Sequence, residues 1–173
     1  MKKLLMAIAV LSVGLFSSCD KCKDADCKNG ATCEKKVGDC NCPTFYNGTK
    51  CDGEVRSNYV GTYIGTSTTV FTVQGQTITE TETDTMEVIT NGTTVTKLDI
   101  KGDGTSDDPN VPLVLSNNTD FTATTSFTEN GTLINATGSG KFTSTTLSLN
   151  ATLSGDFSGQ PITGALSFTG TKQ

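Results

Sequence analysis

Apolar and polar residues alternate in short runs along most of this chain, from Asn58 to the C-terminus. A period of two predicts β-strands that bury one face and expose the other. The alternation is clearest from Phe121 to Phe127, from Ala151 to Phe157 and from Ile162 to Phe168, where apolar or small residues occupy most alternate positions and threonine or serine mostly fills the others. Each of these runs therefore predicts a strand with an apolar inner face.

The rest of this region has the same character. Its last 117 residues contain 29 threonines, and β-branched residues fit a pleated strand better than a helix. Turns are predicted at Gln74-Gly75, Asn91-Gly92, Asn130-Gly131, Gly138-Ser139-Gly140 and Gly159-Gln160-Pro161. The predicted strands are Asn58 to Thr66, Thr68 to Val73, Gln76 to Thr83, Thr85 to Thr90, Thr93 to Ile100, Val111 to Leu115, Asp120 to Thr128, Leu133 to Thr137, Lys141 to Leu149, Ala151 to Phe157 and Ile162 to Thr169.

Short connections between these strands favour an antiparallel meander, so the fold class is mainly β. A meander with one apolar face must close into a barrel or pack as two sheets, since a single open sheet leaves that face in water. We predict an up-and-down antiparallel barrel over residues 58–173, with a β-sandwich as the alternative. The runs Tyr59 to Thr66 and Leu166 to Lys172 resemble the first and last strands of lipocalin-like (calycin-like) lipoprotein domains of the Bacteroidota.

The N-terminus reads as an export signal. Residues 1–18 combine Lys2 and Lys3 with an apolar run from Leu4 to Leu15, which is too short for a comfortable transmembrane helix. Ser17 and Ser18 before Cys19 resemble a bacterial lipobox, which implies that Cys19 becomes the first mature residue and carries acyl chains such as palmitate. Residues 19–21 would then form the lipidated N-terminus; a secreted form cut nearby is the alternative.

Six further cysteines lie between Cys22 and Cys51, and no cysteine follows them. Their even number and close spacing predict a disulfide framework in an oxidising compartment, with fifteen possible connectivities. Zinc is disfavoured, because the chain has no histidine and no two CxxC pairs at zinc-site spacing. A segment this short cannot fold on its few apolar side chains, so the crosslinks must hold it.

The spacing, with Asn29 to Cys33 and Cys40 to Pro43 followed by an aromatic pair and Gly48, resembles an epidermal growth factor-like module over residues 22–51. The resemblance implies pairing of Cys22 with Cys33, Cys27 with Cys40 and Cys42 with Cys51. The segment ahead of Cys22 is too short for the calcium ligands of some family members, so a metal-free module is expected. Residues 52–57 form a short linker, which predicts contact between the two domains.

We predict no catalytic site and no cofactor. Without histidine the chain lacks an ordinary nucleophile and base pair, and Glu80, Glu82 and Glu87 lie among threonines on strand faces predicted to be exposed. The acidic stretch from Asp99 to Asn110 is interpreted as a polar surface loop at a barrel rim, with a hard-cation loop as the disfavoured alternative. Asp84-Thr85-Met86 resembles an O-glycosylation acceptor of exported Bacteroidota proteins, which makes Thr85 a candidate glycosylation site.

The barrel interior is the candidate ligand site, since an eight-stranded barrel is either filled by side chains or wide enough for one small molecule. Residues 57–173 carry 4 basic and 11 acidic groups, which disfavours nucleic acid and other anionic partners. A neutral or cationic partner fits better. The candidate lumen residues are Tyr59, Tyr63, Phe121, Phe127, Phe157 and Phe168.

Together these features predict a non-enzymatic lipoprotein of the cell envelope that displays a β-domain for binding or adhesion. The expected location is the outer membrane, with the protein facing the surface or the periplasm and attached through its acyl chains. Its partner would be an unidentified protein, glycan or small apolar ligand. The alternative function is a lipocalin-like carrier that holds a small apolar ligand inside the barrel.

Overall fold

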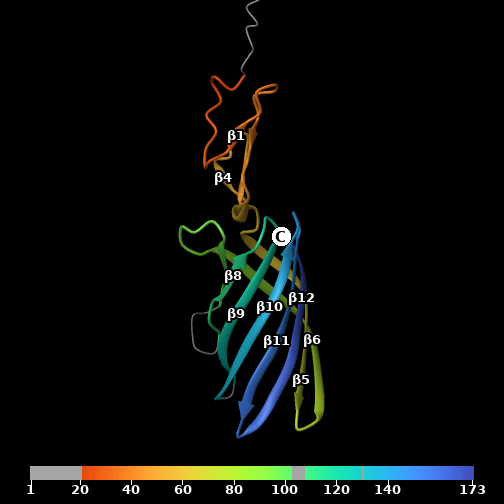
Figure 1. Ribbon diagram of the computed structural model, residues 1–173. Coiled ribbons are helices and arrows are strands. Elements are labelled where there is room, and N and C mark those ends of the chain that lie inside the picture. The colour runs from red at the N-terminus through yellow and green to blue at the C-terminus, as the bar shows by residue number, and fades with distance from the viewer. Residues whose placement is uncertain (1–20, 103–107, 130) are drawn as a thin grey trace, which may run out of the picture.

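The computed structural model describes residues 21–102, 108–129 and 131–173. The predicted export signal and Cys19 lie outside these residues. A small disulfide-rich region stands at one end of an elongated β-barrel, and the C-terminus lies at the junction between them (Figure 1). Among the described residues, no helix is long and apolar enough to cross a membrane.

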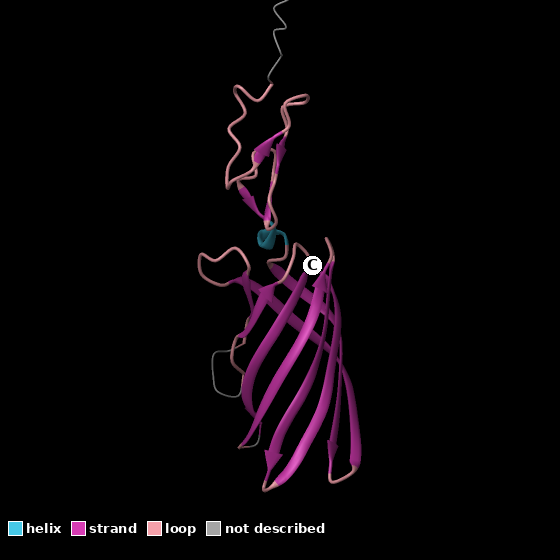
Figure 2. Cartoon of the chain, viewed as in Figure 1, coloured by secondary structure: helices cyan, strands magenta, loops and turns pink. Residues whose placement is uncertain are grey.

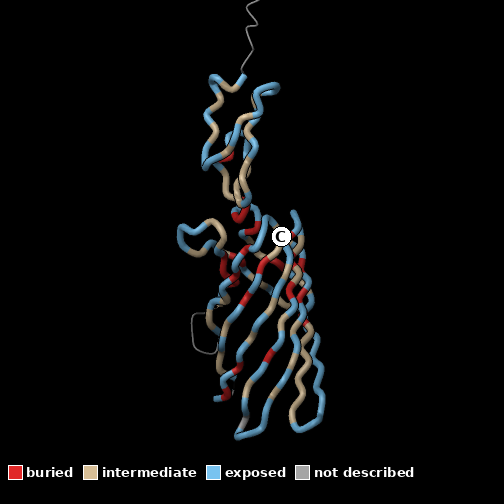
Figure 3. The backbone as a smooth tube through the Cα atoms, viewed as in Figure 1, coloured by how far each residue is buried: buried red, intermediate tan, exposed pale blue. Residues whose placement is uncertain are grey.

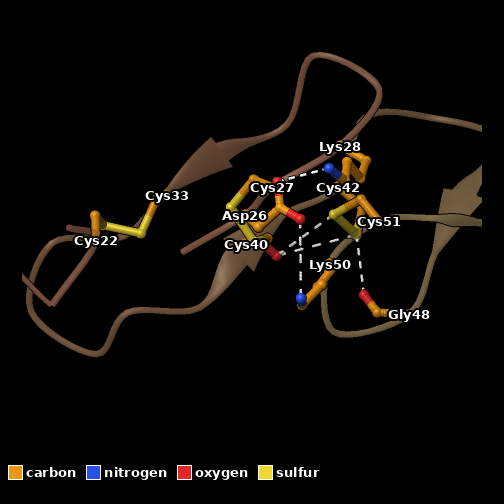
Figure 4. Close-up of a disulfide and its surroundings, with 10 residues drawn as sticks. All are labelled: Cys22, Asp26, Cys27, Lys28, Cys33, Cys40, Cys42, Gly48, Lys50 and Cys51. Atoms are coloured by element: carbon orange, nitrogen blue, oxygen red, sulfur yellow. Dashed lines mark hydrogen bonds and ion pairs between the residues drawn. A yellow bond between two sulfur atoms is a disulfide. The ribbon is translucent and has the colours of Figure 1, made fainter. Parts of the chain in front are cut away.

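The small region is built from two short hairpins. Strand β1 (Thr32–Cys33) pairs with β2 (Cys40–Asn41), and β3 (Tyr46–Asn47) pairs with β4 (Gly53–Glu54). Disulfides join Cys22 to Cys33, Cys27 to Cys40 and Cys42 to Cys51, which is the pairing that the family resemblance implied. Apart from Cys51, the half-cystines are exposed or only partly buried, so the crosslinks and not an apolar core hold this region together (Figure 4).

One acidic side chain in this region lies between two lysines. The Asp26 carboxylate lies 2.6 Å from the Lys28 ammonium and 3.9 Å from that of Lys50 (Figure 4). The hydrogen bond and charge of Lys28 hold the pKa of Asp26 below its ordinary value, with a smaller contribution from Lys50. All three groups are exposed, so this cluster adds little to stability.

The rest of the chain forms one closed, antiparallel, eight-stranded barrel in which the strands follow one another in sequence order (Figure 2). This confirms the predicted barrel and rules out the β-sandwich. Closure occurs where the first barrel strand pairs with the last. The strands are β5 (Gly61–Val73), β6 (Gln76–Thr90), β7 (Lys97–Ile100), β8 (Val111–Leu115), β9 (Asp120–Glu129), β10 (Thr132–Phe142), β11 (Thr146–Phe157) and β12 (Gln160–Lys172).

Several predicted strand boundaries are wrong, because neighbouring runs join into longer strands. The predicted breaks at Ser67 and Asp84 lie inside β5 and β6, and the predicted turn Gly138-Ser139-Gly140 lies inside β10. Glycine is required at position 140 for packing and not for a turn, because a Cβ there would lie 2.3 Å from the ring of Phe121 on β9. The chain turns after Phe142, so the predicted strand from Lys141 to Leu149 is split between β10 and β11.

The register assigns every barrel residue to a face, because directly opposed residues share a face. Phe121 is opposite Gly140, which is opposite Leu149, which is opposite Phe168. Apolar and small residues therefore face the lumen along β9 to β12, as the alternation predicted. The outward positions of these strands carry mainly threonine, serine and asparagine and are largely exposed.

Many of the buried residues gather at the end of the barrel next to the disulfide-rich region (Figure 3). The ring of Phe142 stacks on Tyr59 with centroids 4.4 Å apart, and it contacts Phe121 at 4.9 Å and Tyr63 at 6.2 Å. The five aromatic residues Tyr59, Tyr63, Phe121, Phe142 and Phe168 pack with buried aliphatic side chains into one core. We call these five residues the aromatic plug.

The linker predicted over residues 52–57 forms β4 and a 3-10 helix, η1 (Val55–Asn58). Arg56 in η1 is 5% exposed and donates hydrogen bonds to the side chain of Glu54, at 2.6 Å, and to four backbone carbonyls of the connection between β6 and β7. Those carbonyls belong to Asn91, Gly92, Thr94 and Lys97 and lie 2.7 to 3.3 Å away.

A second contact comes from the disulfide-rich region itself. The backbone N–H of Phe45 donates to the side-chain oxygen of Asn118 at 2.7 Å, and the Phe45 side chain packs against the barrel core. Together with Arg56, these contacts hold the region against the barrel, as the short linker predicted. Sequence reasoning did not single out Arg56, although it is the only arginine in the chain.

Arg56→Ala should lower the free energy of unfolding by about 3 kcal/mol, because four backbone carbonyls and the Glu54 carboxylate lose a buried, charged donor. This corresponds to a melting temperature lower by roughly 6–12 °C for a chain of this size. Arg56→Lys should be intermediate, since an ammonium reaches fewer of the carbonyls than a guanidinium. The melting temperatures can be measured by following thermal unfolding with circular dichroism. Lys36→Ala, a substitution of an exposed residue, is the control. An Arg56→Ala variant that melts with the wild type would contradict the role of this contact.

Candidate functional site

The inner face of the barrel changes in character along its length. At the end next to the disulfide-rich region it is filled by the aromatic plug, in the middle it is lined by small residues, and at the far end apolar side chains surround a cavity. The small residues of the middle are Gly138, Ala136, Ala151, Gly155 and Gly164, and they alternate with Leu153 and Leu166. The lumen holds a cavity at its far end.

Four of the six residues predicted to line a ligand site belong to the aromatic plug. Tyr59, Tyr63, Phe121 and Phe168 are each at most 6% exposed and pack against one another or Phe142. These four are brought together as core, in contact with each other. The structure does not bring Phe127 into this group, and the side chain of Phe157 lies outside the described residues.

The two tyrosines link the plug to the surrounding backbone. The Tyr63 hydroxyl donates to the carbonyl of Tyr59 at 2.9 Å, and the Tyr59 hydroxyl donates a short hydrogen bond to the carbonyl of Asn118. Burial raises the pKa of Tyr63 to about 12, with a smaller contribution from the nearby Tyr59. Burial also raises the pKa of Tyr59. Both phenols are therefore neutral at physiological pH and act as structural donors.

A second group of apolar residues surrounds a cavity of about 240 Å³ at the far end of the barrel. This is smaller than the 300–1,000 Å³ typical of drug-sized ligand sites. Phe127 lines this cavity, so one predicted ligand residue does face open space. The lining residues come from the β5/β6 hairpin, the β9/β10 hairpin and β12: Phe71, Val73, Ile78, Phe127, Glu129, Thr132, Ile134 and Ile162.

A shallow hollow of about 560 Å³ lies over β5, β12, β11 and β10. Most of its lining residues are outward-facing, including Thr68, Ser139, Asn150 and Ser167. Hydroxyl and amide side chains alternate with small and aliphatic residues, and no aromatic side chain or charged group lines it. Sequence reasoning did not find this hollow, because it arises from the curvature of four neighbouring strands.

Glu80, Glu82 and Glu87 are exposed, as predicted, and Asp84 is half-buried, but these acidic residues of β6 do not share one face. The register places Glu80, Glu82 and Asp84 opposite Thr69, Ser67 and Gly65 of β5, on the inward face, whereas Glu87 faces outward. Glu87 forms an ion pair with Lys101 at 2.9 Å. Sequence alternation alone did not reveal that three carboxylates face the lumen side.

Thr85, the candidate glycosylation site, lies within β6 on the outward face and is exposed. Its backbone N–H donates to the carboxylate of Asp84 at 2.7 Å. The hydroxyl is therefore reachable from solvent, and its modification stays a prediction.

The acidic stretch from Asp99 to Asn110 is described only in part. Asp99 is buried and accepts a hydrogen bond from the Asn91 side chain at 2.7 Å, so it belongs to the barrel wall. Gly102 donates its N–H to the Asn110 side chain at 3.0 Å, which brings the two ends of the loop together. Residues 103–107 lie outside the described residues. Within the described part of the chain, no three acidic, cysteine or histidine side chains are placed to share a metal ion.

The raised pKa of Tyr63 predicts a loss of stability at alkaline pH. In the unfolded chain tyrosine ionises near pH 10, whereas folded Tyr63 stays protonated until about pH 12. Its contribution to the free energy of unfolding is thus complete below pH 10 and is lost as the pH rises from about 10 to 12. Tyr63→Phe should flatten this part of the pH profile, measured by urea unfolding, while Tyr46→Phe should not. If the free energy of unfolding fell equally with pH in the wild type and in Tyr63→Phe, the loss of stability would not come from Tyr63.

Comparison with known proteins leaves the family open. No family model matches this chain, and no curated protein matches it. Among solved structures, the crystal structure of a putative outer membrane protein from Bacteroides fragilis superposes with a TM-score of 0.42 and 20% identity. The match covers 68% of this chain and 52% of that one, so the chain spans about half the length of that protein.

Proposed function

We propose that this protein is a non-enzymatic cell-envelope lipoprotein that holds its barrel away from the membrane and displays it for binding. The observation that supports this most directly is that the two ends of the molecule differ along its long axis. The disulfide-rich region, which follows the predicted acyl anchor at Cys19, is attached to the filled end of the barrel. The hairpins whose residues line the cavity lie at the opposite end (Figure 1).

The distribution of side chains on the barrel supports a location in water. Outward positions on β9 to β12 carry polar residues such as Thr124, Thr137 and Thr152, and the apolar residues face inward. A barrel embedded in a bilayer has the reverse arrangement, with an apolar band outside and a polar interior. In this proposal the acyl chains alone attach the protein to the outer membrane.

The absence of histidine from the chain supports a role in binding. The carboxylates along β6 are solvated, and the two tyrosines of the plug are buried and neutral. A general acid or base needs a shifted pKa and access to substrate together. In this proposal the barrel binds its partner without transforming it.

Cys19→Ala should release the protein from the membrane fraction, because stable attachment requires two or more acyl chains on that residue. Intact-mass analysis of the extracted wild type should show acylation and three disulfides. Protease added to intact cells should cut the barrel if it is displayed at the surface; a barrel cut only after the outer membrane is opened would place it in the periplasm. Membrane retention of the Cys19→Ala variant would contradict the anchor.

A second candidate function is a carrier of a small apolar ligand, which the far cavity of about 240 Å³ favours. Its lining is almost entirely apolar, and it opens at the end of the barrel away from the anchor. Only a compact ligand would fit, because the aromatic plug closes the rest of the lumen.

The carrier candidate predicts saturable binding of a small apolar fluorophore such as 1-aminoanthracene. Ile162→Trp should fill the cavity and weaken binding about tenfold or more, since bulk replaces the space that the probe needs. Leu133→Trp is the matched control, because Leu133 lies on the outward face and is 57% exposed. No saturable binding by the wild type would exclude the carrier function and leave display as the role.

A further inference from the structure

One barrel strand is much longer than the neighbour that should cover it. Strand β6 runs from Gln76 to Thr90, and β5 pairs with it from Gln76 to Val88. On the other side, β7 pairs only with Val88, Ile89 and Thr90. One further backbone bond, from Lys101 N–H to the carbonyl of Glu87 at 2.8 Å, ends this contact. Within the described part of the chain, β6 before Glu87 is therefore an open edge.

The backbone groups at this edge can be identified from the pairing. Glu87 and Asn91 bond toward β7, and hydrogen-bonding direction alternates along an antiparallel strand, so odd-numbered residues point away from β5. The pairing of β5 with β6 continues without a bulge, which keeps this alternation intact. Of the edge N–H groups, that of Thr85 is bonded to Asp84. The odd-numbered edge residues are Thr77, Thr79, Thr81, Thr83 and Thr85.

The even-numbered positions place negative charge beside this open edge. Glu80, Glu82 and Asp84 lie on one face at every second position. None of them forms an ion pair among the described residues, and the residues opposite them on β5 are uncharged. The strand therefore presents a row of uncompensated carboxylates at the spacing of alternate side chains on an extended chain.

We propose that the edge of β6 from Thr77 to Thr85 binds an extended, basic segment of a partner protein by strand addition. The partner backbone would pair with the threonine N–H and carbonyl groups. Lysine or arginine at every second position of the partner would lie opposite Glu80, Glu82 and Asp84, because directly opposed residues share a face. This proposal deepens the display function by naming the class of partner.

Charge also makes a second copy of the same chain a poor partner for this edge. If two β6 edges paired antiparallel, inward residues would face inward residues, which places carboxylate against carboxylate. Inward-pointing charges on an edge strand prevent such self-pairing. Strand β9 also extends past β8, which pairs with it only as far as Ala123. Of the inward residues on that edge, Thr125 and Phe127 carry no charge and Glu129 carries a single one at the far end of the strand. The β9 edge therefore lacks the row of carboxylates that β6 offers a basic chain.

The probe is a fluorescent peptide of alternating lysine and threonine, with an otherwise identical peptide of glutamate and threonine as control. Binding to the purified, exported protein is measured by fluorescence anisotropy in solution, so the result does not depend on the membrane anchor. We expect the basic peptide to bind at least about tenfold more tightly than the acidic one, with affinity falling as salt is added. Hydrogen exchange at Thr79, Thr81 and Thr83 should slow when the basic peptide binds.

Two variants separate backbone pairing from simple charge attraction. Thr81→Pro removes an N–H that faces solvent, which edge strands tolerate, and should weaken binding about tenfold or more without unfolding the barrel. Glu80→Gln combined with Glu82→Gln and Asp84→Asn should weaken binding to a similar extent and reduce its salt dependence. Matched controls are Ser126→Pro on the β9 edge and Glu34→Gln in the disulfide-rich region, both of which should bind like the wild type.

Equal binding of the two peptides, or undiminished binding by a folded Thr81→Pro variant, would overturn the proposal. Unchanged exchange at the three threonine amides of the wild type would also overturn it, and this measurement requires no variant. A wild-type dimer in sedimentation that Thr81→Pro dissociates would assign the edge to a second copy instead. None of these results would affect the proposed anchor or the carrier cavity, which are tested separately.

Discussion

The stacking of Phe142 on Tyr59, with Phe121 and Tyr63 around it, is the contact on which the rest of this structure depends. The barrel has few large apolar side chains, and most of those that are fully buried lie at this end. The same end receives Phe45 and Arg56, so closure of the barrel and attachment of the disulfide-rich region use one core. The region and the barrel therefore form one connected unit.

Concentrating the core at one end leaves the other end with little to fill it. Glycine and alanine line the middle of the lumen, and a cavity remains between the far hairpins. The strands there are held mainly by their backbone ladders, and threonine suits this because it favours extended backbone at modest size. The far half is therefore the more open part of the barrel.

The unequal strand lengths make the barrel wall, too, more open in its far half. Strands β7 and β8 are short and close the barrel only beside the plug, while β6 and β9 continue past them. Among the described residues the wall therefore has two open edges, and that of β6 is rich in threonine and carboxylate. Edge strands are usually blunted against association, and inward carboxylates on β6 disfavour self-pairing. In the proposed strand addition, the same carboxylates would select a basic chain.

The sequence by itself determined the disulfide framework, the β class and the inner face of β9 to β12, because cysteine spacing and period-two alternation are local properties. The resemblance supplied the disulfide pairing that the structure has. Only the tertiary structure decided that Gly138 and Gly140 lie within a strand, that Tyr59 and Phe168 fill the core, and that Arg56 joins the two regions. It also decided where β7 leaves β6 uncovered. These features depend on which strands become neighbours and how far their pairing extends, and neither quantity is encoded in a short run of residues.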